Sequence, residues 1–233
     1  MTPLVTITNL HAGYGNAQVL FGVNLDVTKG HVSTLMGRNG MGKTTTVRCL
    51  MGLLKSTSGT ITIREKDMTE AAPYQIAQGG IGLVPEGRHV FPSLSVSENL
   101  RATARPAQDG WSEERIYEAF PRLGQRRRNS GFQLSGGEQQ MLAIGRALMT
   151  NPSVLILDEA TEGLAPMIRE EIWTMLASLK RDGLSILLID KNLDELARIS
   201  DRYFVIEKGE IVWKGDAHDF TDNRAQVEQY LHL

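Results

Sequence analysis

The sequence predicts an α/β protein whose mainly parallel sheet is interrupted by a helical insertion. Several short runs are apolar throughout, as in strands that helices cover on both faces. The predicted strands span residues 4–10, 31–36, 60–64, 81–84, 154–158, 185–190 and 202–207. Between residues 95 and 150 the apolar spacing becomes helical, with helices predicted near 112–120 and 138–149. We therefore expect a helical subdomain at about 95–150.

The size of the chain suits one core. Its 233 residues are 41% hydrophobic, which is too little chain for two full-sized enzyme domains, so we expect residues 1–233 to form a single unit. Cys49 is the only cysteine, and the amino terminus has neither a basic leader nor a long apolar stretch. No apolar run approaches the roughly 20 residues of a membrane-spanning helix. These features favour a cytoplasmic protein.

The charge distribution argues against nucleic acid as a primary ligand. The formal net charge is −2, which gives no electrostatic footprint for a polyanion. The only compact basic cluster consists of Arg126 and the two arginines that follow it. A solvated loop is the favoured interpretation of this cluster, and a surface that meets lipid headgroups is the alternative.

A glycine-rich segment matches the P-loop pattern G-x-x-x-x-G-K-[ST]. It follows the strand predicted to end at Met36 and opens a helix running to Leu54, which is the context that this motif requires. Backbone N–H groups and the helix N-terminus converge on an anion, Lys43 adds positive charge near the terminal phosphates, and Thr44 offers a hydroxyl to Mg²⁺. The predicted nucleotide-binding residues are Gly37, Arg38, Asn39, Gly40, Met41, Gly42, Lys43, Thr44 and Thr45.

The strand predicted at 154–158 ends in two carboxylates. Both follow an apolar run, so they lie at the carboxyl end of the strand, where open α/β sheets bind their ligands. We expect Asp158 to reach Mg²⁺, directly or through water. Glu159 points another way and can orient the water that attacks a γ-phosphate. The pair therefore predicts hydrolysis as well as binding; a solvated acidic strand end is the alternative.

A second turn, Leu134-Ser135-Gly136-Gly137-Glu138, begins another helix with small residues that leave backbone donors open to a phosphate. With the P-loop before it and the acidic pair after it, the chain resembles the ABC ATPases, whose signature motif is LSGGQ-like. The resemblance covers essentially the whole chain. It implies ATP and Mg²⁺ as ligands, a P-loop NTPase (RecA-like) core and an antiparallel β subdomain at the N-terminus.

The same resemblance implies roles that the spacing of residues does not give. Two cassettes of this family pack head to tail, so the signature turn of one subunit would clasp the γ-phosphate held by the P-loop of the other. The residues concerned would be Ser135, Gly136, Gly137 and Glu138. Tyr14 corresponds to the aromatic residue that stacks on adenine in such cassettes.

The match can be narrowed to one group of transporters. The segment from Val84 to Pro92, VPEGRHVFP, and the later Gly163-Leu164-Ala165-Pro166 look like the importer ATPases for branched-chain and other hydrophobic amino acids, the LivF type. That group implies a second, homologous or identical ATPase subunit, two integral-membrane permease subunits and, indirectly, a periplasmic solute-binding protein. It also implies a peripheral position on the inner face of the cell membrane. Phe91 and Pro92 lie where such cassettes meet the permease, although packing within the insertion is an equal alternative.

Two positions depart from most cassettes. Glu86 stands where glutamine is usual, and Lys191 stands where histidine is usual. A carboxylate beside a triphosphate needs a cation, because two unit charges about 4 Å apart interact by about 4 kcal/mol at an effective dielectric near 20. We therefore expect Glu86 to coordinate Mg²⁺ through water or to pair with Lys191. Lys191 is expected to hold the γ-phosphate, and a solvated lysine is the alternative.

Three other functions share some of these motifs. A chromosome-maintenance or DNA-repair ATPase would insert a long coiled coil between the P-loop and the signature turn, and no heptad run occurs there. A translation-type ATPase usually carries two cassettes in one chain. A regulatory subunit that binds ATP with little hydrolysis is the third alternative, suggested by Glu86 and Lys191.

Overall fold

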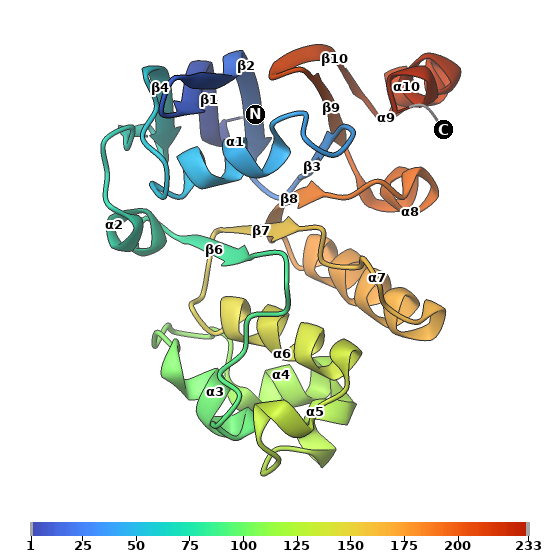
Figure 1. Ribbon diagram of the computed structural model, residues 1–233. Helices are drawn as coiled ribbons and strands as arrows, with labels where there is room; N and C mark the ends of the chain where they lie inside the picture. Colours follow the sequence, from blue (N-terminus) through green and yellow to red (C-terminus); the bar gives the residue numbers. More distant parts are fainter. Residues whose placement is uncertain (1, 232–233) are drawn as a thin grey trace.

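The computed structural model of the protein describes residues 2–231, which are built on two β-sheets (Figure 1). One sheet has four antiparallel strands in the order β2-β1-β4-β5, and the other has six strands in the order β10-β9-β3-β8-β7-β6. In the larger sheet only β10 runs antiparallel to its neighbour. The strands are β1 (Pro3–Tyr14), β2 (Ala17–Thr28), β3 (Val32–Met36), β4 (Ser58–Ile63), β5 (Lys66–Asp67), β6 (Ile81–Val84), β7 (Val154–Asp158), β8 (Ser185–Ile189), β9 (Arg202–Glu207) and β10 (Glu210–Asp216).

Helices fill the space between and below the sheets. In Figure 1, α3 to α6 gather in one layer at the bottom, while α1 lies beside the antiparallel sheet at the top. The chain leaves the larger sheet after β6, forms this helical layer and returns as β7, the neighbour of β6. The helices are α1 (Lys43–Leu50), α2 (Pro73–Gln78), α3 (Val96–Ala102), α4 (Glu113–Ala119), α5 (Pro121–Gln125), the 3₁₀ turn η1 (Gly131–Gln133), α6 (Gly136–Leu148), α7 (Pro166–Arg181), α8 (Leu193–Ile199), α9 (Ala217–Asp222) and α10 (Arg224–Leu231).

The larger sheet is buried on both faces. Every residue of β3, β7 and β8 is buried. Because side chains alternate along a strand, Leu155 and Leu157 join the core that contains α6 and α7, whereas Val154 and Ile156 join the core that contains α1 and the antiparallel sheet. This two-sided burial explains why these strands are apolar throughout.

Side-chain caps set the starts of the helices in the insertion. Ser95 accepts a hydrogen bond from the N–H of Glu98, whose carboxylate accepts from the N–H of Ser95 in return. Ser135 and Glu138 form the same reciprocal pair at the start of α6. Each reciprocal pair is a capping box, which gives hydrogen-bond partners to N–H groups that the start of a helix otherwise leaves without them.

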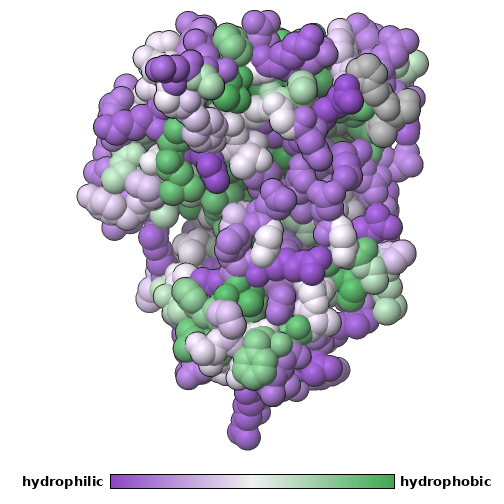
Figure 2. All heavy atoms as spheres, in the orientation of Figure 1, coloured by the Kyte–Doolittle hydropathy of each residue, from purple (hydrophilic) through white to green (hydrophobic). Residues whose placement is uncertain are grey.

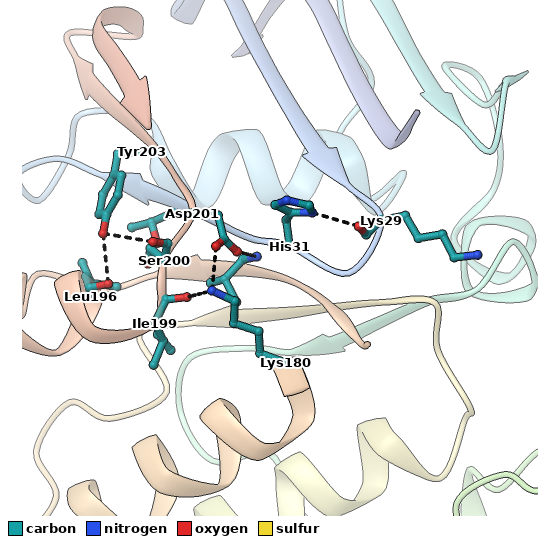
Figure 3. Close-up of polar contacts among 10 residues, drawn as sticks. Lys29, His31, Lys180, Leu196, Ile199, Ser200, Asp201 and Tyr203 are labelled. Atoms are coloured by element: carbon teal, nitrogen blue, oxygen red, sulfur yellow. Dashed lines mark hydrogen bonds and ion pairs between the residues drawn. The ribbon is translucent and has the colours of Figure 1, made fainter. Parts of the chain in front are cut away.

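A polar network anchors the start of β3, the strand that leads into the P-loop (Figure 3). Lys180, in the last turn of α7, donates to the carbonyl oxygen of Ile199 (2.9 Å) and to Asp201 (2.6 Å). The second carboxylate oxygen of Asp201 accepts from the N–H of Val32 (2.9 Å). One carboxylate thus fixes α7 and the start of β9 relative to β3.

The predicted fold class is confirmed, with differences at particular elements. The predicted strands at 81–84, 154–158 and 202–207 have the observed bounds. The strands β2, β5 and β10 were not predicted; β5 has two exposed residues, β10 buries none of its residues and β2 mixes exposed with buried ones, so none of them gives a continuous apolar run. The helix that follows the P-loop ends at Leu50, before Leu54. All the helices between residues 96 and 148 lie in the predicted insertion, while the division of the chain into one unit with a helical subdomain stays a prediction.

Asn99 should be a strong contributor to the stability of the insertion. Its fully buried amide accepts from the N–H of Phe91 (2.8 Å) and donates to the carbonyl oxygens of Phe91, Leu94 and Ser95. We expect Asn99→Ala to lower the free energy of unfolding by about 2–4 kcal/mol, since each buried polar group left without a partner costs about 1–3 kcal/mol. Urea unfolding measures this. The side chain of Gln108 is exposed and forms no hydrogen bond with any of residues 2–231, and Gln108→Ala should change stability by less than about 0.5 kcal/mol. Equal losses in the two variants would contradict the assignment.

Candidate functional site

The P-loop turns between the end of β3 and the start of α1. Gly40 (φ 80°) and Gly42 (φ 110°) adopt left-handed backbone conformations that glycine reaches without strain. Gly42 occupies the N-cap position of α1 and offers no side chain there, so no side chain caps the first N–H groups of the helix. Gly37 packs so closely on β9 that an added Cβ atom would lie 2.4 Å from the carbonyl oxygen of Ile206. The loop therefore has the shape of an anion cradle.

Lys43 folds back across this loop. Its buried Nζ donates to the carbonyl oxygens of Gly37 (2.9 Å) and Arg38 (3.1 Å). The same Nζ lies 3.4 Å from Oε1 of Glu159, at the end of β7. The ion pair joins the two predicted motifs, although 115 residues and several elements separate them in the sequence.

A cavity of about 370 Å³ lies against the P-loop. Its lining brings together residues from three separate segments of the chain. They are Asn39, Gly40, Gly42, Lys43, Thr44, Thr45, Glu86, Glu159 and Glu162. Three other predicted P-loop residues do not line it: Gly37 packs on β9, Arg38 is exposed, and the carbonyl oxygen of Met41 accepts from the N–H of Gly209 (3.0 Å).

Asp158 is a buried carboxylate without a complete set of partners. It is 3% exposed, and its Oδ1 has no hydrogen-bond partner among residues 2–231. Burial raises the pKa of Asp158 and the Glu86 carboxylate raises it further, while Lys43 and the hydroxyl of Thr44 lower it. Unpaired oxygen atoms beside a hydroxyl and a second carboxylate are ligands that Mg²⁺ prefers, so Asp158, Thr44 and Glu86 fit the predicted metal site.

Glu159 follows β7 in a left-handed conformation (φ 50°), and its N–H donates to Ile189 of β8 (2.8 Å). This turn directs its side chain into the cavity rather than along the strand. The neighbouring carboxyl group of Glu162 raises the pKa of Glu159 to about 7; partial burial adds to this, and Lys43 opposes it. Glu159 is thus a carboxylate with a base strength suited to accepting a proton near neutral pH.

Lys191 pairs with a residue that the sequence analysis did not consider. Its Nζ lies 2.6 Å from Oε1 of Glu162, and this contact raises the pKa of Lys191. The expected pair between Lys191 and Glu86 is therefore not formed; the cation lies beside the segment that follows Glu159. Glu86 itself has no ion pair in the described part of the chain. Glu162 lies only three residues after Glu159, and this additional acidic residue was the one sequence feature that could have indicated a partner for Lys191.

The signature turn lies outside the cavity. Ser135, Gly136, Gly137 and Glu138 begin α6, and none of them lines the P-loop cavity. Burial alone would raise the pKa of Glu138, but the hydrogen bonds from Ser135 and the charge of Arg126 outweigh it and hold the pKa below the usual value. The Nε atom of Arg126 lies 2.7 Å from Oε1 of Glu138. Arg126 and the two arginines that follow it lie exposed in a turn, as the favoured interpretation of a solvated loop expects, and Arg126 in addition neutralises Glu138 of the signature turn.

Tyr14 also lies outside that cavity, at the end of β1. Its ring is about half exposed, and its hydroxyl accepts from Nη1 of Arg48 on α1 (3.4 Å). The helix that begins with Lys43 therefore holds this exposed ring.

Comparison with known proteins agrees with this geometry. The sequence profile of the ABC transporter family matches residues 20–162. The chain is 40% identical to the high-affinity branched-chain amino acid transport ATP-binding protein BraG of Pseudomonas aeruginosa, over 94% of this chain and 95% of that protein. It is 36% identical to the Nod factor export ATP-binding protein I of Cupriavidus metallidurans, over 96% of this chain and 74% of that protein.

A solved structure gives the same result for the fold. The crystal structure of a nucleotide-free ATP-binding cassette from an ABC transporter superposes with a TM-score of 0.87 at 26% identity, over 100% of this chain and 99% of that one. In the part of the chain that the structure describes, no helix is long and apolar enough to span a membrane. The chain belongs to the ABC transporter family, as a nucleotide-binding cassette that hydrolyses ATP.

Proposed function

We propose that this chain is the ATPase subunit of a membrane importer for branched-chain or other hydrophobic amino acids. The observation that carries the hydrolytic part is the convergence of Lys43, Glu86 and Glu159 on one cavity beside the P-loop. The similarity to BraG, a protein of branched-chain amino acid transport, supports the class of substrate. The similarity to a Nod factor export protein makes export the alternative direction.

ATP would bind with its phosphates in the P-loop. The N–H groups at the start of α1 have no side-chain cap, and Lys43 adds a full charge. Phosphate oxygens would compete with Glu159 for the ammonium group of Lys43, so binding would free the carboxylate of Glu159. Adenine would stack on the exposed ring of Tyr14.

Thr44 and Asp158 would hold Mg²⁺, with Glu86 as a further ligand, directly or through water. When bound, Mg²⁺ neutralises charge on the β- and γ-phosphates. Glu159 would accept a hydrogen bond from the attacking water and then its proton. The oxygen of that water forms the new bond to the γ-phosphorus, and the bond from this phosphorus to the β,γ-bridging oxygen breaks, which releases ADP and phosphate.

The partners are proposed from the family and from two surfaces. Ser135, Gly136, Gly137 and Glu138 would meet the nucleotide of a second ATPase subunit, identical or homologous. The permease subunits would dock near the exposed Phe91 and Pro92, and the guanidinium of Arg146 lies 4.2 Å from the Phe91 ring and fixes its orientation. Figure 2 shows a mostly hydrophilic face with hydrophobic residues in several groups, one of them over the helical layer at the bottom and another at the upper left. The cassette would lie on the inner face of the membrane, with a periplasmic solute-binding protein acting through the permeases.

Replacing Glu159 with glutamine should separate binding from hydrolysis. Glutamine keeps the shape but accepts no proton, so we expect Glu159→Gln to reduce kcat by about 100-fold or more. ATP binding should be retained or strengthened. Phosphate release and calorimetric titration with ATP measure the two properties. Glu118 is exposed and forms no ion pair within the described residues, and Glu118→Gln serves as the control. Wild-type turnover in Glu159→Gln would favour a different base.

Lys191→Ala should weaken ATP binding more than it slows turnover. The change removes a cation and leaves Glu162 without its partner beside the phosphates. Because the pair is largely exposed, we expect Kd for ATP to rise by up to about fivefold, with a smaller change in kcat. The double variant Lys191→Ala/Glu162→Gln should recover part of the affinity. A large loss of kcat at unchanged KM would instead assign Lys191 to the transition state.

Transport by the assembled complex tests the proposed function directly. We expect the chain, co-expressed with its permease and ATPase partners and reconstituted in vesicles, to drive uptake of labelled leucine or a related amino acid when ATP and the binding protein are supplied. A complex that contains Glu159→Gln should not transport. ATP-driven movement of solute in the opposite direction, with no uptake, would establish export instead.

A further inference from the structure

The chain turns sharply just after Glu86. Gly87 (φ 96°) and Arg88 (φ 54°) adopt left-handed conformations in succession. Glycine does so freely, whereas arginine does so at a cost of about 1 kcal/mol or more. Backbone strain of this kind occurs where surrounding contacts hold the residue in place, so the contacts of the Arg88 side chain are informative.

The guanidinium of Arg88 bridges two segments that are distant in the sequence. Its Nη2 donates to the carbonyl oxygen of Gly163 (3.2 Å), four residues after Glu159. Its Nη1 lies so close to Gly136 that a Cβ atom at that position would come within 2.2 Å. No carboxylate within residues 2–231 forms an ion pair with Arg88. One side chain therefore touches the start of α6 and the segment that carries the proposed base.

Glu86 lines the P-loop cavity, and the other hydrogen bonds between segment 86–92 and side chains of the described chain lead into the insertion. Arg146 on α6 donates to the carbonyl oxygen of His89 (2.6 Å), and Asn99 on α3 accepts from the N–H of Phe91 and donates to its carbonyl oxygen. Among the side-chain hydrogen bonds of this segment in the described chain, that of Arg88 alone reaches residues 159–165. Movement of the insertion would thus be transmitted to the Glu159 segment through this contact.

We propose that Arg88 is a positioning residue that couples the helical insertion to the segment carrying Glu159. The inference rests on the proposed function, in which Glu159 orients the attacking water. Segment 159–165 includes two left-handed residues, Glu159 (φ 50°) and Gly163 (φ 66°), so its path depends on what holds it. A planar guanidinium bonded to the Gly163 carbonyl and seated over Gly136 fixes that path.

The test is a separation of kcat from KM in the purified chain. We expect Arg88→Ala to lower kcat about tenfold, because a displacement of about 1 Å at a reacting group can cost up to about 100-fold. KM and Kd for ATP should stay within about twofold, because Arg88 does not line the P-loop cavity. Arg88→Lys, which keeps a single cationic donor, should lose about threefold and carries the test if the alanine variant fails to fold. Arg128 is an exposed arginine of the same insertion whose side chain forms no hydrogen bond in the described part of the chain, and Arg128→Ala should match wild type.

Hydrogen exchange provides the readout that a general loss of stability would not give. Amides in residues 159–165 should exchange about tenfold faster in Arg88→Ala, while those of β3 and β8 stay at the wild-type rate. Wild-type kcat in Arg88→Ala would overturn the proposal, and so would a lower kcat with unchanged exchange over residues 159–165. If the wild-type chain hydrolyses no ATP, the proposed function fails, and the exchange comparison still tests whether Arg88 holds the segment.

Discussion

The ion pair between Lys43 and Glu159 is the contact on which the site depends. Lys43 begins α1, after the loop that follows β3, and Glu159 directly follows β7, so their 3.4 Å approach joins the carboxyl ends of two strands that β8 separates in the sheet. A buried ammonium needs partners, and it takes them from Glu159 and from two carbonyl oxygens of its own loop. The same bonds keep the P-loop in a conformation that can surround a phosphate. The entropic cost of ordering the loop when nucleotide binds is therefore small.

The balance of charge around the cavity determines which form of nucleotide it suits. Glu86, Asp158, Glu159 and Glu162 lie at or beside the cavity, and the lysines nearest to them are Lys43 and Lys191. Burial raises the pKa of Asp158 and the Glu86 carboxylate adds to this, while the neighbouring Glu162 raises the pKa of Glu159. A bare triphosphate would add further repulsion. The site therefore favours a triphosphate that brings its own divalent cation, which agrees with the unpaired oxygen atom of Asp158.

How well the sequence predicts a contact in the site depends on how far apart the two residues are in the chain. The P-loop is one continuous segment of the sequence, and so is the pair of acids. Each follows a buried strand with an apolar run, so the strand that precedes each motif could be predicted. The pair between Lys191 and Glu162 spans 29 residues and depends on how β7 and β8 lie side by side. Nothing local distinguishes Glu162 from Glu86 as its partner. Edge strand β10 was missed for the opposite reason, since a strand that buries nothing leaves no periodic signal.

The separation of the two phosphate-type turns is the last consequence of the fold. The P-loop belongs to the sheet, whereas the signature turn caps α6 in the helical layer, and none of its residues lines the P-loop cavity. Arg126 neutralises Glu138 there, so this turn can approach a phosphate without carrying a net negative charge. A turn prepared in this way but placed away from its own chain's cavity suits the proposed role of binding a phosphate that another subunit holds. A second cassette would supply that phosphate, and the position of the insertion would then decide whether the two halves of the site meet.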